Sequence, residues 1–264
     1  MTREITSATN PFVKELRALA TSKKARQESG TFIIEGWRGI GTLLTHESQS
    51  YKLERLVISK ERQNDPRLPD SIDTVVLPDF VFAKISDVKN TQGILGVVRH
   101  TPAPFEFFPD TGHYLLLDAI RDPGNLGTLI RSAVGAEFDG ILLYGDCVEP
   151  FNPKVIRSSM GTFAFSNIWT ISHIDIDRLL ATGYEFCATT GHDGNSLYET
   201  VFTKKTVLVV GSEAHGISDE LMQLATQTIT IPLAKECESL NAAMAGSICM
   251  FQIRLGSSCD TSRA

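Results

Sequence analysis

The chain has 264 residues and a net charge of −6. Its length allows one large domain or two ordinary ones, and its apolar fraction of 42% is sufficient for a hydrophobic core. The whole-protein charge gives no sign of nucleic-acid binding, although residues 1–62 carry +4 and the remainder therefore −10. The five cysteines form no C-x-x-C pair, no metal-ligand spacing is present and no apolar run approaches ~18 residues. We therefore expect a cytoplasmic protein with no membrane span, signal peptide or metal site.

The first hundred residues alternate helix and strand patterns. Asn10 and Pro11 are typical of the cap and the first position of a helix. Helical patterns cover 10–20, 37–46 and a segment that opens after Pro78, and strand patterns cover 31–36, 53–59, 73–77 and 93–100. This alternation predicts a small α/β unit over residues 1–100, and three prolines then predict a linker over 101–112.

The second part predicts a parallel sheet covered by helices, in a domain over 113–256 with a flexible tail at 257–264. Near-continuous apolar runs are typical of parallel strands buried on both faces. They cover 114–118, 140–145, 184–190, 206–211 and 227–232, with a weaker one near 162–169. Helical patterns cover 125–137, 153–160, 174–182, 218–226 and 239–255. The last helix carries one apolar stripe, formed by Leu240, Met244, Ile248, Phe251 and Leu255.

Loops rich in Gly, Asn, Ser or acidic residues follow several of these strands. In chain order they read AIRDPGNLG, GHDGNS, SEAHGIS and LAKECESLN. Because ligands of open parallel sheets bind beyond the carboxyl ends of the strands, these loops predict a ligand site. The usual phosphate cradles are absent, since residues 123–127 offer only G-x-x-G and no Lys-Ser/Thr follows Gly216. An adenosine-containing ligand stays open.

Arg131 lies off the apolar face of the helix that follows the first of these loops. The local pattern alone favours a surface arginine or an ion pair. The alternative is a guanidinium group that holds a phosphate or a reacting hydroxyl.

Three segments resemble, in order and spacing, the motifs of the SpoU (TrmH-type) branch of the SPOUT RNA methyltransferases. They are LLLDAIRDPGNLGTLIRSA, VLVVGSEAHGIS and ITIPLAKECESLNAAMAGSI. The opening ITSATNPFVKELRAL…KKARQESGTFIIEG resembles the substrate-binding domain that often precedes the catalytic domain. The resemblance implies an α/β fold with a parallel-sheet SPOUT domain, a deep trefoil knot and a small α/β RNA-binding domain before it. It also implies a homodimer with the cofactor pocket near the subunit interface.

The resemblance also implies roles for individual residues, with S-adenosylmethionine as the cofactor. It assigns catalytic roles to Asn125, Arg131, Glu213, Ser239 and Asn241, and cofactor binding to Thr190, Gly211, Ile231, Pro232 and Leu240. Gly211 is expected to let the cofactor approach the backbone. Ser239 suits the cap of the last helix, and Asn241 is expected to bridge to the loop that carries Arg131.

The implied reaction is methyl transfer to a ribose 2′-hydroxyl, with ribosomal RNA as the first choice of substrate and transfer RNA as the next. A guanidinium group, with a reference pKa of about 12.5 or above, is a poor general base. We therefore expect Arg131 to position the hydroxyl and a neighbouring phosphate and to stabilise developing negative charge. Lys235 stands where the family often has glycine, and Ala242 and Ala243 replace a commoner Val-Ser pair, so these positions bear on the pocket shape.

Two other functions stay open at this point. One is an RNA-binding protein with an inactive methyltransferase domain, which the intact motif residues oppose. The other is a dinucleotide-dependent oxidoreductase, which the missing glycine fingerprint opposes. The motifs do not identify the target RNA or the nucleotide.

Overall fold

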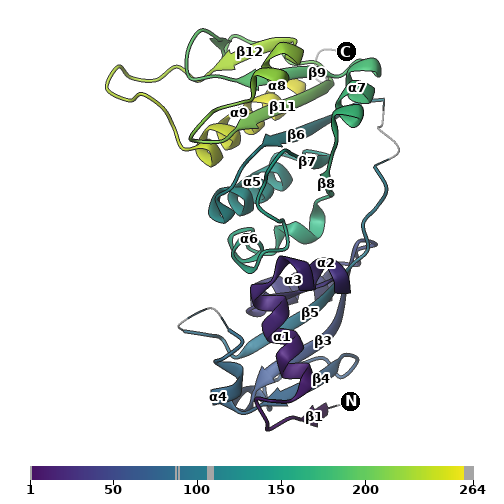
Figure 1. Cartoon of the computed structure of the whole chain (residues 1–264). Helices are drawn as coiled ribbons and strands as arrows, with labels where there is room; N and C mark the ends of the chain where they lie inside the picture. The colour runs from purple at the N-terminus through teal and green to yellow at the C-terminus, as the bar shows by residue number, and fades with distance from the viewer. Residues whose placement is uncertain (1, 87, 89, 106–109, 259–264) are drawn as a thin grey trace. The chain divides into compact units, whose positions relative to one another are not determined.

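The computed structural model describes residues 2–86, 88, 90–105 and 110–258, which form two compact units (Figure 1). The first unit comprises Met1–Ala103 with Glu149–Phe165, and the second comprises Pro104–Val148 with Ser166–Ala264. Residues 106–109 of the predicted linker and 259–264 of the predicted tail lie outside the described residues. Within the described part of the chain, no helix combines the length and the apolar character needed to cross a membrane.

The first unit is built on a mixed five-stranded sheet in the order β1-β4-β3-β5-β2. Strand β4 pairs in parallel with β1 and β3, whereas β5 runs antiparallel to β3 and β2. The predicted strands are confirmed, and β1 is an addition that the sequence patterns do not indicate. The strand bounds are β1 Thr2–Glu4, β2 Thr31–Glu35, β3 Tyr51–Ser59, β4 Asp73–Leu77 and β5 Ile94–His100.

Helices cover both faces of this sheet. Helices α1 (Pro11–Thr21) and α4 (Asp79–Phe82) share one apolar cluster, in which Leu16 and Phe82 pack with Val57 of the sheet. Helix α3 (Trp37–Thr45) packs on the opposite face, where its Ile40 lies beside Gly96. Helix α2 (Lys23–Ser29) and the 3-10 turn η1 (Lys60–Arg62) were not predicted, because short polar segments carry no apolar periodicity.

Residues 149–165, which come from the second half of the sequence, pack on the first unit. They form α6 (Pro153–Ser158) and the 3-10 turn η2 (Thr162–Phe165). Arg26 donates from Nε and Nη2 to the carboxylate of Glu149, at 2.9 and 2.5 Å, and the side chains are only 5% and 8% exposed. Phe151 stacks on Phe32 with the ring centroids 4.7 Å apart. A buried ion pair and a ring stack thus attach this segment.

The second unit contains an all-parallel seven-stranded sheet in the order β10-β12-β9-β11-β6-β7-β8. This confirms the predicted parallel sheet. The weak signal near 162–169 resolves into η2 and the short strand β8, and β10 was not predicted. The strand bounds are β6 Gly112–Asp118, β7 Gly140–Tyr144, β8 Ile168–Thr170, β9 Glu185–Thr189, β10 Asn195–Ser196, β11 Lys205–Gly211 and β12 Gln227–Thr230.

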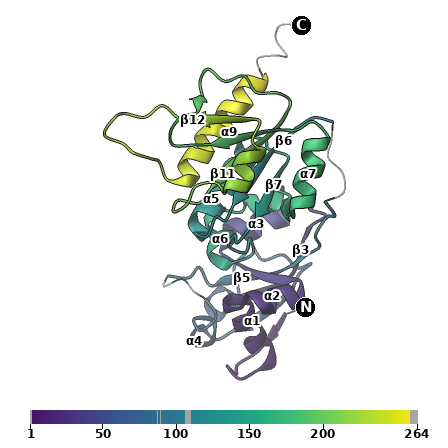
Figure 2. The same ribbon diagram turned by 45° about the horizontal axis from the view of Figure 1, so that its top comes forward.

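Helices also cover both faces of the second sheet. Helices α7 (His173–Ala181) and α8 (Asp219–Leu224) bury Ile176, Leu179 and Leu221 in one apolar cluster. Helices α5 (Pro123–Gly135) and α9 (Ala242–Ser258) pack together on the other face (Figure 2). Gly246 lets the two helices approach, since a Cβ atom at this position would lie 2.7 Å from Leu129 Cδ2 and would require that side chain to shift. The trefoil knot that the resemblance implies stays a prediction.

The predicted apolar stripe of α9 is not the face that α9 buries. Met244, Phe251 and Leu255 are 56%, 46% and 63% exposed. The buried positions are instead Ala242, Ala243, Gly246, Cys249, Met250 and Ile253. The expectation was wrong because α9 is apolar around most of its circumference, so periodicity alone does not select the buried face.

The Arg26–Glu149 pair yields a test of how residues 149–165 are held. Glu149→Ala leaves a buried guanidinium without its partner, so we expect the free energy of unfolding to fall by about 3 to 5 kcal/mol. The matched control is Glu28→Ala, because Glu28 pairs with Lys24 at side-chain exposures of 67% and 82% and should cost less than about 1 kcal/mol. Urea denaturation of the full chain measures both values, and equal losses would contradict the assignment.

Candidate functional site

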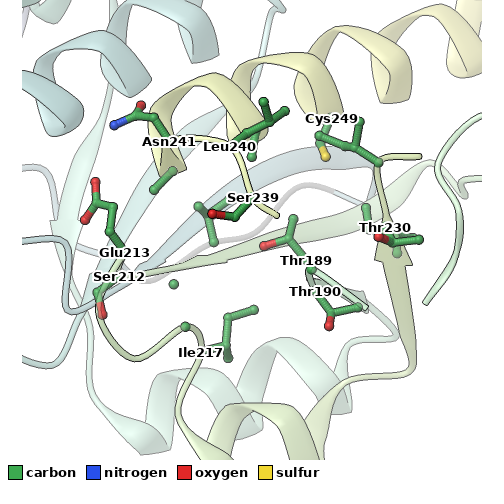
Figure 3. Close-up of a pocket in the computed structure, with 18 of the residues that line it drawn as sticks. Thr189, Thr190, Ser212, Glu213, Ile217, Thr230, Ser239, Leu240, Asn241 and Cys249 are labelled. Atoms are coloured by element: carbon green, nitrogen blue, oxygen red, sulfur yellow. The ribbon is translucent and has the colours of Figure 1, made fainter. Parts of the chain in front are cut away.

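A cavity of about 360 Å³ lies at the carboxyl ends of β9, β11 and β12, under the start of α9 (Figure 3). Its lining comes from four segments, within residues 189–191, 210–217, 229–233 and 239–249. This volume is typical of small-molecule sites. The cavity therefore lies where three of the four loops singled out in the sequence converge, and the fourth reaches its rim through Asn125.

Gly211 ends β11 and is required by the backbone that folds over it. A Cβ atom at this position would lie 2.1 Å from the carbonyl carbon of Gly216 and 2.2 Å from its oxygen. Ser212 and Gly216 exchange two backbone hydrogen bonds of 3.0 and 2.9 Å, which close the turn against Gly211. The structure thus gives a reason for glycine at position 211 that the sequence does not give. Only a residue without a Cβ atom leaves room for the turn that forms one wall of the cavity.

The walls combine apolar side chains with hydroxyl groups. Ile217, Ile231, Leu233 and Leu240 supply the apolar surface. The hydroxyl groups belong to Thr189, Thr190, Thr230, Ser212 and Ser239. Two of them are fixed, since Thr189 Oγ1 donates to the carbonyl of Val209 at 3.0 Å and Thr190 Oγ1 to that of His192 at 2.7 Å.

Cys249 of α9 closes part of the cavity. Burial raises the pKa of its thiol to about 12, so the group is neutral near pH 7 and acts as a small apolar surface. The sequence patterns do not single out Cys249, Thr189, Ser212 or Ile217. For Thr189 and Ser212 a signal was present, because each neighbours a residue that the sequence assigns to the site. Ile217 lies in the SEAHGIS loop that the sequence indicates, whereas Cys249 has no such signal.

Three side chains from three separate loops meet at the rim of the cavity. Asn125 Nδ2 donates to Glu213 Oε1, and Asn241 Nδ2 donates to Asn125 Oδ1 at 3.1 Å. The bridge expected from Asn241 to the α5 loop is therefore present. In Figure 3, Glu213 and Asn241 lie at the same end of the cavity.

Asn241, rather than Ser239, caps α9. Its Oδ1 accepts hydrogen bonds from the backbone N–H groups of Ala243 and Met244, at 3.0 and 3.2 Å. The predicted cap at Ser239 was wrong because the helix begins at Ala242, later than the sequence pattern indicates. Ser239 is thus left to line the cavity.

Arg131, Pro232 and Lys235 do not line the cavity, and all three side chains are exposed. Among the described residues, the Arg131 guanidinium has no hydrogen-bond or ion-pair partner. Pro232 and Lys235 belong to a loop between β12 and α9 that projects from the body of the second unit (Figures 1 and 2). The roles that the resemblance implies for Arg131 and Pro232 stay predictions.

Comparison with known proteins gives matches along most of the chain. The model of the SpoU rRNA Methylase family matches residues 112–251, and that of the MRM3-like substrate binding domain matches residues 10–96. The chain is 30% identical to the Bacillus subtilis 23S rRNA (guanosine(2553)-2′-O)-methyltransferase RlmP, with 96% of this chain and 99% of RlmP covered.

Solved structures agree with these matches. The AdoMet-bound rRNA methyltransferase from Sinorhizobium meliloti superposes with a TM-score of 0.82 at 32% identity, covering 96% of this chain and 98% of that one. The SpoU methyltransferase AviRb from Streptomyces viridochromogenes, in complex with AdoMet, superposes with a TM-score of 0.84 over 94% of this chain and 98% of AviRb. At 21% identity the second likeness concerns the fold alone.

The turn over Gly211 yields a prediction about the cavity wall. Gly211→Ala places a methyl group where the Gly216 backbone lies, so the turn must shift, and we expect a loss of about 1 to 3 kcal/mol in unfolding free energy. Faster amide hydrogen exchange at Ser212 and Gly216 should accompany that loss. Gly191→Ala in the same cavity is the matched control, because no described atom lies within 4 Å of the place its methyl group would take. Unchanged exchange in Gly211→Ala would show that the turn does not depend on this contact.

Proposed function

Because the chain belongs to the SpoU rRNA methylase family, we propose that it transfers a methyl group from S-adenosylmethionine to a ribose 2′-hydroxyl of ribosomal RNA. The observation that carries this proposal is the cavity at the carboxyl ends of β9, β11 and β12, which the residues of the second and third motifs line. We propose that this reaction takes place in the cytoplasm, as part of rRNA processing. The names of the relatives above favour ribosomal over transfer RNA.

The lining of the cavity fits the methyl donor. Apolar walls at Ile217, Ile231 and Leu240 suit a purine ring. Hydroxyl groups at Thr190 and Ser239 suit a ribose and an amino-acid tail. In this proposal Pro232 contributes by fixing the backbone next to Ile231. When bound, S-adenosylmethionine supplies a methyl group that a sulfonium centre has already activated.

The chain's own task is then to orient the ribose and to stabilise the charge that develops on its 2′-oxygen, while the hydroxyl proton passes to solvent. In the proposed mechanism, the contacts among Asn125, Glu213 and Asn241 fix the start of α5 to the rim of the cavity. Arg131 lies further along this same helix, with its guanidinium exposed toward solvent. It holds the RNA phosphate and hydroxyl in line and stabilises the negative charge that develops on the ribose oxygen.

The proposed division of labour follows the two parts of the sequence. Residues 1–100 bind the RNA, residues 101–112 link, and residues 113–256 hold the methyl donor and carry out the transfer. The match of an MRM3-like substrate binding domain to residues 10–96 supports the first assignment.

Labelled methyl transfer tests this function. With tritiated S-adenosylmethionine and an unmodified transcript of large-subunit ribosomal RNA, we expect label in the RNA at a position that resists alkaline cleavage. Arg131→Ala should lower the transfer rate by about a hundredfold or more and leave S-adenosylmethionine binding unchanged in calorimetry. Arg178→Ala on α7 controls for the loss of one surface cation. An absence of label with the wild-type chain would contradict the function, and a normal rate in Arg131→Ala would remove Arg131 from the mechanism.

We also propose that the protein is a homodimer joined through α9. The exposed apolar side chains Met244, Phe251 and Leu255 lie on one helix, and water contact with such a surface is unfavourable. In a dimer with a two-fold axis through this face, the same apolar patches of the two subunits would pack against each other and be removed from water. A Cβ atom added at Gly135 of α5 would lie 3.3 Å from the Phe251 ring, so the proposed interface extends to the helix that carries Arg131.

Sedimentation equilibrium tests the dimer. We expect the wild-type chain to have twice the mass of one chain, and Leu255→Glu to shift it toward the monomer, because a carboxylate would be buried against an apolar partner surface. Phe80→Glu is the control, since Phe80 is 62% exposed on the first unit. A monomeric wild-type chain at micromolar concentration would contradict the proposal.

A further inference from the structure

A hollow on the first unit carries positive charge from two helices. Its volume is about 370 Å³, and its lining includes Lys14, Arg17 and Thr21 of α1 and Lys84, which follows α4. The floor is formed by Ala18, Ala20 and the buried Ile85. None of the described residues that line it carries a carboxylate. We propose that this hollow binds phosphate groups of the RNA backbone and so docks the substrate on the first unit.

The sequence of α1 explains why these cations gather on one side. Lys14, Arg17 and Thr21 follow each other at about one helical turn, so they share a face, while Val13, Leu16 and Leu19 are buried against the sheet. Because α1 and α4 contribute to the same apolar cluster, the end of α4 is held beside α1. Lys84, which follows α4, therefore lines the same hollow as Lys14 and Arg17.

The charges in the hollow are not compensated within the described part of the chain. The side chains of Lys14 and Arg17 make no hydrogen bond or ion pair there, and Lys84 only approaches the Phe80 ring, with Nζ 6.0 Å from its centroid. By contrast, Arg55, Lys60 and Arg99 of the same unit each pair with a carboxylate. The three cations around the hollow are thus available to a negatively charged partner.

The lining favours an RNA backbone over an acidic peptide. A peptide partner gains most of its affinity from large apolar or aromatic anchors in matching pockets, and the floor here offers only two alanines and one isoleucine. The described residues lining the hollow include no aromatic ring on which a base could stack, and the exposed Phe80 ring beside Lys84 is not part of the lining. What they offer is concave positive charge, which contacts phosphates and positions a nucleic acid without reading its sequence.

This inference rests on the proposed function, because that function supplies the RNA. It adds a requirement of its own, namely that the hollow affects how tightly RNA binds and leaves the chemical step unchanged. Removing its cations should therefore raise KM for RNA and leave kcat and S-adenosylmethionine binding as they are.

The experiment compares two triple variants of the full chain. One removes the cations of the hollow, as Lys14→Gln, Arg17→Gln and Lys84→Gln, and the other removes cations outside it, as Lys24→Gln, Lys52→Gln and Lys60→Gln. RNA affinity is measured by titration with an unmodified large-subunit ribosomal RNA transcript at several salt concentrations, and thermal unfolding confirms that both variants fold. A third variant, Lys14→Arg with Lys84→Arg, keeps the charge.

We expect the hollow variant to bind RNA at least about tenfold more weakly, and the slope of log affinity against log salt to fall by about 2 to 3. The control triple should change both quantities less, and the arginine variant should bind like the wild type. Equal losses in the two triples, or a wild-type salt slope in the hollow variant, would overturn the proposal. If the wild-type chain binds RNA through these cations but transfers no methyl group, then the proposed function fails and the docking site stands.

Discussion

The functional half of this molecule depends on a small hydrogen-bond network that joins segments far apart in the sequence. Asn125 bonds Glu213, which is 88 residues away, and Asn241, which is 116 residues away. Asn241 also caps α9, and Asp122 Oδ1 accepts from the backbone N–H of Asn125 at 2.9 Å and so caps α5. The starts of two helices and the turn after β11 are thereby joined to each other at the rim of the cavity.

Much of the second unit could be predicted because its strands carry a strong signal. Strands buried on both faces must be apolar along their whole length, and this requirement is visible in single stretches such as residues 206–211. Features that depend on tertiary contacts could not be predicted. The attachment of residues 149–165 to the first unit rests on the pairing of Arg26 with Glu149, two residues 123 positions apart that look like ordinary surface charges in the sequence. The buried face of α9 was equally hidden, because almost every face of that helix is apolar.

The site shows the same division between local and distant constraints. Motif residues such as Gly211, Ile231 and Leu240 line the cavity, so the order and spacing of the motifs indicated which residues come together there. The physical reason was less accessible. Position 211 requires glycine because the backbone of Gly216 lies where a Cβ atom would be. Asn241, and not Ser239, caps α9. Both facts depend on where the turn and the helix begin. Cys249 lines the cavity because it lies on the face of α9 that packs against the sheet. The apolar stripe that the sequence pattern indicated lies on a different face of this helix.

The distribution of charge gives the proposed function a further physical basis. The residues of the first unit carry +4 and those of the second carry −10, so a polyanion is repelled on average by the unit that holds the cavity. Under the proposed function, attraction for RNA must then come mainly from cations of the first unit, and Arg131 acts as an isolated positive group near the reaction site. In such an arrangement the first unit supplies most of the binding affinity for RNA, and the second unit carries out the methyl transfer. An RNA that does not bind the first unit would therefore bind only weakly to the second. Most of the RNA affinity would then arise before the ribose reaches the methyl donor, with a strong dependence on salt.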